Sequence, residues 1–137
     1  MILAVDIGNS ATKFGIFRGE RLLSAWRVPH GKPLRPCPKG ITRTAVSSVN
    51  PGALRRILPR LPAPVLLAGR DFRIPLKGAC RGTGTDRLLA AYAAWRTAQG
   101  PVAVFDVGTA ITLNLVDANG RFLGGAIFAG PETAREA

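Results

Sequence analysis

Cysteine and histidine are scarce in this chain of 137 residues. The two cysteines, Cys37 and Cys80, stand far apart and form no CxxC pair, and His30 is the one histidine. Structural zinc sites need several of these ligands close together, so the sequence excludes zinc chemistry. A disulfide is not implied either, and both cysteines are expected to be plain thiols.

Acidic residues are also few, with 8 Asp and Glu against 19 Lys and Arg, which gives a formal net charge of +11. Such a surplus can attract nucleic acid or an anionic substrate. The sequence shows no helix-turn-helix signature, no RNA-binding motif and no interleaving of aromatic and basic residues. These absences favour a generally cationic surface, and we expect no nucleic-acid partner.

Long apolar runs are missing as well. No stretch approaches the roughly 20 residues that span a bilayer, and Asp6 interrupts the first apolar run almost at once. The N-terminus lacks the basic start and the cleavage site of a signal peptide. We therefore expect a cytoplasmic protein with no membrane partner.

The residues that are present predict an α/β fold, because short apolar strands alternate with two helical patterns. In the first helix Asn50 is expected as the N-cap, Pro51 in the first turn, and Pro59 as the residue that shortens or bends it. Strands are expected at 1–6, 11–17, 21–28, 43–49, 64–69 and from 102 onward, and the first turns of another helix at 131–137.

The second helix is the alanine- and leucine-rich run over residues 86–100. Thr83 or Thr85 is available as its N-terminal cap, and Gly100 is expected to close it.

A strand-turn-strand unit occurs twice in the chain. Asp6, Gly8 and Thr12 recur as Asp106, Gly108 and Thr112, an offset of 100 residues. The hairpin glycine Gly19 recurs one residue later as Gly120, and an apolar strand again follows it. A repeated supersecondary unit predicts two related lobes that face each other.

The repeated turn has the chemistry of a phosphate-binding loop. Glycine lets an anion approach the backbone N–H groups of a tight turn, and Ser10 and Thr109 can add hydroxyl donors. Lys13 on the following strand can reach the same phosphates. Asp6 and Asp106 have the wrong charge for phosphate alone, but they suit a hard cation bound to it. We therefore expect the two acids to flank a cleft that holds a metal-bound nucleotide triphosphate; the alternative is an Asx-turn in which each aspartate satisfies its own backbone.

A third acid, Asp86, stands in "GTGTDR" just before the second helix. As a functional group it would be a general base that takes a proton from a substrate hydroxyl as this attacks the γ-phosphorus. Arg87 beside it could bind a substrate carboxylate. The alternative is that Asp86 only interacts with the helix dipole.

Three segments together resemble one family. "DIGNSATK" is similar to the first phosphate motif of the actin-like, sugar-kinase and Hsp70-type ATPase superfamily. "SSV" followed closely by proline, "GTDR" before an alanine-rich helix, and "DVGTAITLNLVDANGRFLGGAIFAG" resemble the type III pantothenate kinases, which phosphorylate pantothenate in the first step of coenzyme A synthesis. The order and spacing of these segments match over essentially the whole chain.

The resemblance implies an α/β actin-like ATPase (ribonuclease H-like) lobe, with a mixed sheet flanked by helices, over residues 1–100. Residues 101–137 would be the first strands of a second, related lobe. The implied cofactors are ATP with Mg²⁺ and a monovalent cation, K⁺ or NH₄⁺, and the implied assembly is a homodimer.

The resemblance also implies site residues. Asp86 would be the catalytic proton acceptor, and Asp106 would be the ligand of the monovalent cation. The residues matching the ATP-binding segment are Asp6, Ile7, Gly8, Asn9, Ser10, Ala11, Thr12, Lys13 and Thr109. The residues matching the pantothenate-binding tetrad are Gly84, Thr85, Asp86 and Arg87.

The chain departs from the family pattern in three respects. The family usually carries Thr-x-Asp where this chain has Thr112-Leu113-Asn114, and it places a tyrosine before the catalytic aspartate where this chain has no aromatic residue. Family members are also longer, so we expect either a fragment of a longer product or a truncated relative. Two other functions stay open: a non-catalytic regulator of transcription on the same fold, and a kinase for a sugar or another small alcohol.

Overall fold

The structure is a computed structural model that describes residues 1–62, 64–79 and 82–131. The chain divides into two compact units, Met1–Arg73 and Ile74–Ala137, and each is described by itself. The sequence predicted a boundary between two related lobes at residue 100. That boundary separates the duplicated halves of the chain, and it stays a prediction. Cys80 and the helix expected at 131–137, apart from Pro131, lie outside the described residues.

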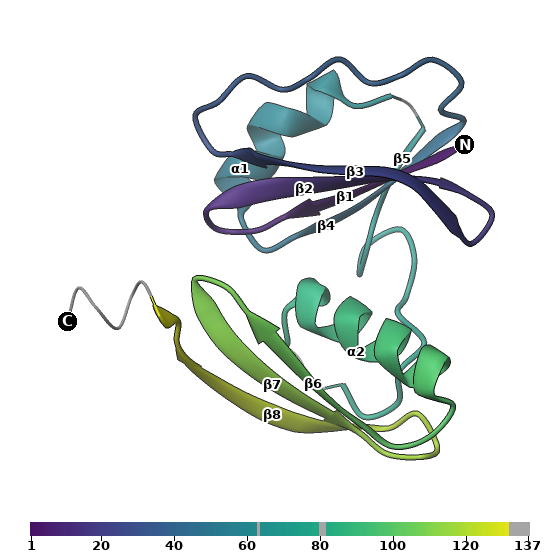
Figure 1. Ribbon diagram of the computed structural model, residues 1–137, viewed down its shortest axis with the longest axis vertical. Helices are drawn as coiled ribbons and strands as arrows, with labels where there is room; N and C mark the ends of the chain where they lie inside the picture. Colours follow the sequence, from purple (N-terminus) through teal and green to yellow (C-terminus); the bar gives the residue numbers. More distant parts are fainter. Residues whose placement is uncertain (63, 80–81, 132–137) are drawn as a thin grey trace. The chain divides into compact units, whose positions relative to one another are not determined.

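The first unit contains a five-stranded mixed sheet with the order β3-β2-β1-β4-β5 (Figure 1). The strands β1 and β2 and the strands β2 and β3 pair antiparallel, whereas β4 is parallel to both β1 and β5. The predicted α/β class with a mixed sheet is therefore confirmed. The bounds are β1 Ile2–Ile7, β2 Ala11–Arg18, β3 Arg21–Pro29, β4 Arg43–Ser48 and β5 Val65–Leu67.

One helix, α1 (Pro51–Ile57), connects β4 to β5. The side chain of Asn50 accepts a hydrogen bond from the backbone N–H of Ala53 at 2.9 Å, which confirms the predicted cap. The chain then tightens into a 3₁₀ turn over Leu58–Arg60, so Pro59 ends the α-helix early, as expected.

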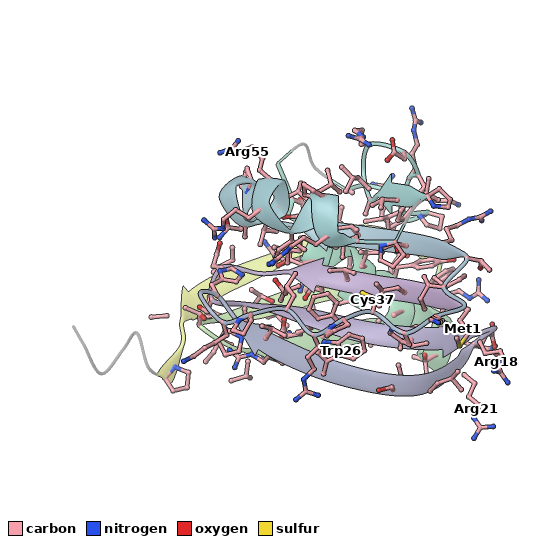
Figure 2. All side chains as sticks on the ribbon, turned by 90° about the horizontal axis from the view of Figure 1, so that it is seen from above. Met1, Arg18, Arg21, Trp26, Cys37 and Arg55 are labelled. Carbon is pink, nitrogen blue, oxygen red and sulfur yellow. The ribbon has the colours of Figure 1, made fainter. Side chains whose placement is uncertain are left out.

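The core of this unit lies between α1 and one face of the sheet. Alternate residues of β1, namely Leu3, Val5 and Ile7, are at most 3% exposed and point to that face. The segment 30–42 runs across the same face beside α1 (Figures 1 and 2). Trp26, labelled in Figure 2, stacks on Phe14 with ring centroids 5.0 Å apart.

Two polar groups stabilise the segments on either side of the edge strand β5. The hydroxyl of Thr44, which is 0% exposed, donates to the backbone carbonyl of Pro62 at 2.7 Å. Beyond β5, Asp71 accepts from the backbone N–H of Leu67 at 2.8 Å and from the guanidinium of Arg70 at 2.9 Å. The hydrogen bonds from Arg70, and then the one from Leu67, lower the pKa of Asp71 below its ordinary value.

The second unit contains the helix α2 and a three-stranded antiparallel sheet, β6-β7-β8 (Figure 1). The bounds are α2 Thr85–Ala98, β6 Val102–Val107, β7 Ala110–Val116 and β8 Phe122–Ala129. The helix packs on β6 and β7, and its fully buried Ala91 belongs to a small core with Leu76, Val116 and Phe122.

Both predicted ends of the long helix are wrong in detail. Gly84 is the N-cap residue, so neither Thr83 nor Thr85 holds that position. At the other end Gln99, with φ of 51°, is the left-handed residue, and its N–H donates to the carbonyl of Trp95 at 2.9 Å. The helix therefore closes one residue before Gly100.

The loop that joins β7 to β8 packs against the ring of Trp95. Gly120 has a φ of 73°, and an added Cβ there would lie 2.9 Å from the Trp95 ring. Both the backbone conformation and the lack of room for a side chain therefore require glycine.

On the sheet face away from Asp106, Phe105 and Val107 are each 65% exposed. None of the described helices has the length and apolar character needed to span a bilayer.

Candidate functional site

The first predicted phosphate turn follows β1. The backbone N–H of Gly8 donates to the carbonyl of Ala11 at 3.0 Å, which closes a turn around Asn9 and Ser10. On the two strands that enter and leave this turn, Asp6 lies directly opposite Lys13. The Lys13 ammonium is 3.9 Å from a carboxylate oxygen of Asp6, and both side chains reach solvent.

Strand alternation separates the residues of the first motif. Asp6 and Lys13 share one face of the sheet, whereas Ile7 lies opposite Thr12 on the other face, with α1. The side chain of Thr12 is 1% exposed on that face. Of the predicted ATP-binding set in this unit, the structure therefore brings Asp6 and Lys13 together and places the Thr12 hydroxyl apart from them.

The second predicted turn follows β6 and is one residue shorter. The N–H of Gly108 donates to the carbonyl of Ala110 at 3.0 Å, so Thr109 alone occupies the turn. On the strands, Asp106 therefore lies opposite Thr112. The offset of 100 residues aligned Thr112 with Thr12, but the shorter turn puts Thr112 at the register position that Lys13 holds in the first unit.

The duplication extends well beyond the two turns. The carbonyl of Ser10 accepts from the N–H of His30 at 3.0 Å, and the carbonyl of Thr109 accepts from the N–H of Gly130 at 3.1 Å. In each unit the third strand also skips one residue in its register, at Leu23 and again 100 residues later in β8. The same bulge and the same loop contact, at offsets of 99 to 100 residues, support a common origin for the two hairpin units.

The predicted substrate tetrad forms the start of α2. Gly84 precedes the helix, Thr85 is its first residue, and Asp86 and Arg87 follow in the first turn. One carboxylate oxygen of Asp86 accepts from the backbone N–H of Arg87 at 2.8 Å. Asp86 is half-buried, and a carboxylate has a second oxygen that can also accept a hydrogen bond.

The guanidinium of Arg87 is held by β7. Its Nε donates to Oδ1 of Asn114 at 2.7 Å, and one Nη donates to the carbonyl of Leu113 at 3.3 Å. Asn114 is fully buried, and its amide nitrogen lies 3.4 Å from the hydroxyl of Thr112. These two acceptors are uncharged, so they orient the guanidinium without neutralising its charge.

Sequence reasoning did not find this role for Asn114. It treated the residue only as a departure from a family pattern, although an amide two residues after Thr112 on the same strand must share its face. Gly125 on β8 was also missed. A Cβ at this position would collide with the carbonyl of Leu113 and would lie 3.1 Å from an Arg87 nitrogen, so only glycine permits this packing.

Within the second unit, one sheet face therefore gathers several candidate residues. Asp106, Thr112 and Asn114 lie on the face that α2 covers, and Asn114 contacts Arg87. The described residues contain no group of three or more His, Cys, Asp or Glu side chains that could hold a metal by themselves. Single carboxylates such as Asp6 and Asp106 fit a hard cation that takes its other ligands from phosphate and water.

The comparisons with known proteins point to one family. The family model for type III pantothenate kinase matches residues 38–137. The chain is 33% identical to the type III pantothenate kinase of Parafrankia sp. (strain EAN1pec) and 35% identical to that of Thermus thermophilus. Both alignments include the whole of this chain but only 62% and 63% of the relatives.

Solved structures agree on the fold. The activator of the 2-hydroxyisocaproyl-CoA dehydratase from Clostridium difficile, with bound ADPNP, matches with a TM-score of 0.51 at 14% identity, over 93% of this chain and 45% of that one. A protein from Sinorhizobium meliloti assigned as a 2-dehydro-3-deoxygalactonokinase matches with a TM-score of 0.51 at 21% identity, over 94% and 53%. The fold is thus the expected actin-like ATPase fold, and the chain belongs to the type III pantothenate kinase family.

Proposed function

We propose that the protein transfers the γ-phosphoryl group of ATP to the primary hydroxyl of pantothenate, in the cytoplasm and as a homodimer. The chain spans just over three fifths of the curated relatives it matches, so the reaction, the substrates and the assembly are all part of this proposal. Its family membership and the two Asp-x-Gly turns support ATP as the phosphoryl donor.

The observation that carries the proposal is the neighbourhood of Arg87. A guanidinium held by a buried amide and a carbonyl keeps its positive charge for a ligand. Pantothenate carries one carboxylate, which such a group binds through charge-assisted hydrogen bonds. Asp86, the adjacent residue in the first turn of α2, is then the group that faces the substrate hydroxyl.

In this mechanism the protein positions the reactants and Asp86 handles the proton. Arg87 binds the substrate carboxylate and fixes the orientation of the molecule, and Asp86 accepts the hydroxyl proton as the oxygen attacks the γ-phosphorus. The N–H groups of the two turns, with Ser10, Thr109 and Lys13, bind phosphate oxygens. When bound, Mg²⁺ and a K⁺ or NH₄⁺ ion would neutralise charge on the phosphates, and Asp6 and Asp106 are the carboxylates that could hold them.

The test is a kinase assay on the protein as its natural gene encodes it, with ATP, Mg²⁺, K⁺ and pantothenate. Replacing Asp86 by Asn should lower kcat by about a hundredfold or more, since general-base catalysis contributes on that order. Glu20→Gln, a charge-equivalent change in an exposed hairpin, is the control. Full activity of the Asp86→Asn variant would remove the proposed base, and faster phosphorylation of a sugar than of pantothenate would refute the substrate.

A further inference from the structure

A cavity of about 360 Å³ lies within the first unit, on the α1 face of its sheet. Its walls come from α1, from the adjoining ends of β2 and β3, and from residues 30–34, in the segment that runs beside α1 in Figures 1 and 2. We propose that this cavity binds a small organic anion with an apolar body, at a site separate from the sheet face on which Asp6 and Lys13 meet. The proposal does not rest on the proposed function.

The floor of the cavity contains two buried polar atoms. The hydroxyl oxygen of Thr12, in a residue that is 1% exposed, and Nε2 of His30 both lack a hydrogen-bond partner among the described residues. A buried polar atom without a partner costs free energy, so nearly all such atoms are satisfied by protein, water or ligand. Both atoms can donate or accept, so they can bind the oxygens of a ligand.

The rim of the cavity is basic. Lys32, Arg56 and Arg60 line it with exposed side chains, and none of the twelve lining residues that the structure describes carries a carboxylate. Cations gathered around one opening raise the local concentration of anions, and a guanidinium can bind a carboxylate or phosphate in a bidentate manner.

The remaining walls are apolar. Val28, Ala53 and Ile57 are each less than 9% exposed, and Leu34 closes the cavity from the loop side. Apolar walls of this kind favour an organic ligand over a bare inorganic ion. The volume lies at the lower end of the range for small-molecule sites, which is about 300–1,000 Å³.

The cavity is distinct from the first phosphate turn. Thr12 lies on the α1 face, whereas its chain neighbour Lys13 and the paired Asp6 lie on the opposite face. A ligand in the cavity therefore does not occupy the sheet face on which Asp6 and Lys13 meet.

His30 is the one histidine in the chain, so the imidazole Hε1 proton gives one NMR signal of its kind, and this signal reports on the cavity. The probes are hexanoate, its neutral six-carbon analogue 1-hexanol, and inorganic phosphate, each titrated at constant ionic strength. We expect saturable movement of the His30 signal with hexanoate, and weaker binding of the other two probes. No movement with hexanoate, or equal affinity for inorganic phosphate, would overturn the proposal.

The matched variants are Arg56→Gln and Arg55→Gln, each of which removes one positive charge from α1. Arg55 does not line the cavity and projects from α1 on the side away from Trp26 in Figure 2. The Arg56→Gln variant should bind hexanoate about tenfold more weakly, the effect of one lost charge-assisted hydrogen bond, whereas Arg55→Gln should bind it as before. Equal weakening by both would mean unspecific attraction to a cationic surface and would refute the site.

A measurement on the unaltered protein makes the test independent of how the variants fold. Nuclear Overhauser contacts between the hexanoate chain and the methyl groups of Val28 and Ile57 are expected, because these side chains wall the cavity. Contacts only with methyl groups elsewhere in the chain would refute the assignment.

Discussion

The bond between Arg87 and Asn114 gives the sharpest prediction for the second unit. Replacing Asn114 by Ala removes the acceptor 2.7 Å from Nε of a half-buried guanidinium and the weaker 3.4 Å contact to Thr112. A hydrogen bond to a charged group contributes about 1.5–3 kcal/mol, and the longer contact adds little. We therefore expect a loss of about 2 kcal/mol in the free energy of unfolding of this unit.

The assay uses tryptophan fluorescence during urea unfolding. Trp26 belongs to the first unit and Trp95 to the second, so a Trp26→Phe background, which keeps an aromatic ring against Phe14, isolates the second. The Asn114→Ala change should lower the urea midpoint by roughly 1 M for an m-value typical of small units. Asn119→Ala, in the exposed hairpin loop, is the control and should leave the midpoint unchanged.

Asn114→Asp separates orientation from charge. The carboxylate keeps an acceptor for Arg87, so stability should be retained, but the guanidinium is now paired with a negative charge. The urea midpoint of Asn114→Asp should therefore lie close to that of the unaltered protein. A midpoint for Asn114→Ala equal to that of the unaltered protein, or a midpoint for Asn114→Asp as low as that for Asn114→Ala, would refute this reasoning.

The remaining predictions concern packing and pH. A Cβ on Gly130 would collide with backbone carbonyls of the second turn, so Gly130→Ala should lower the thermal midpoint of the second unit, whereas Gly100→Ala, with no contact closer than 3.8 Å, should not. Thr44→Val leaves the partly buried carbonyl of Pro62 without this donor and should cost about 1 kcal/mol in urea unfolding, unlike Thr42→Val at an exposed site. Because the pKa of Asp71 is lowered in the folded state, its stabilising effect is complete above its unfolded pKa of about 4 and disappears as the pH falls through the folded pKa. Asp71→Asn should therefore flatten the acid limb of stability against pH, and an unchanged limb would contradict the assignment.

Local signals in the sequence were enough to predict much of the fold. Asn50 before Pro51 predicted a capped helix start, and the structure confirms it, because the cap involves residues only three positions apart. The repeated Asp-x-Gly pattern likewise predicted two hairpin units, since the glycine and the flanking apolar strands lie within a few residues of each other.

Two kinds of feature could not be predicted from the sequence. The first is a contact that depends on tertiary packing, and the second is the exact residue at which a helix or turn ends. Arg87 and Asn114 are 27 residues apart, so their contact exists only once α2 lies on β7. Gln99 takes the left-handed position because the helix ends one residue before the available glycine. The cavity beside α1 depends on how the proline-rich segment after β3 packs, and such a segment has no periodicity from which its path could be predicted.

The residue paired with the acid at the strand end differs between the two units, and this difference has an electrostatic consequence. In the first unit the acid faces a lysine, so the two formal charges sum to zero, whereas in the second unit the corresponding acid faces a threonine and the sum is −1. Leu113, which stands 100 residues after Lys13, is uncharged as well, so the residue opposite the second acid would be neutral with a turn of either length. Two copies of one hairpin can in this way diverge, the second becoming more attractive to positive ions while their backbones stay alike.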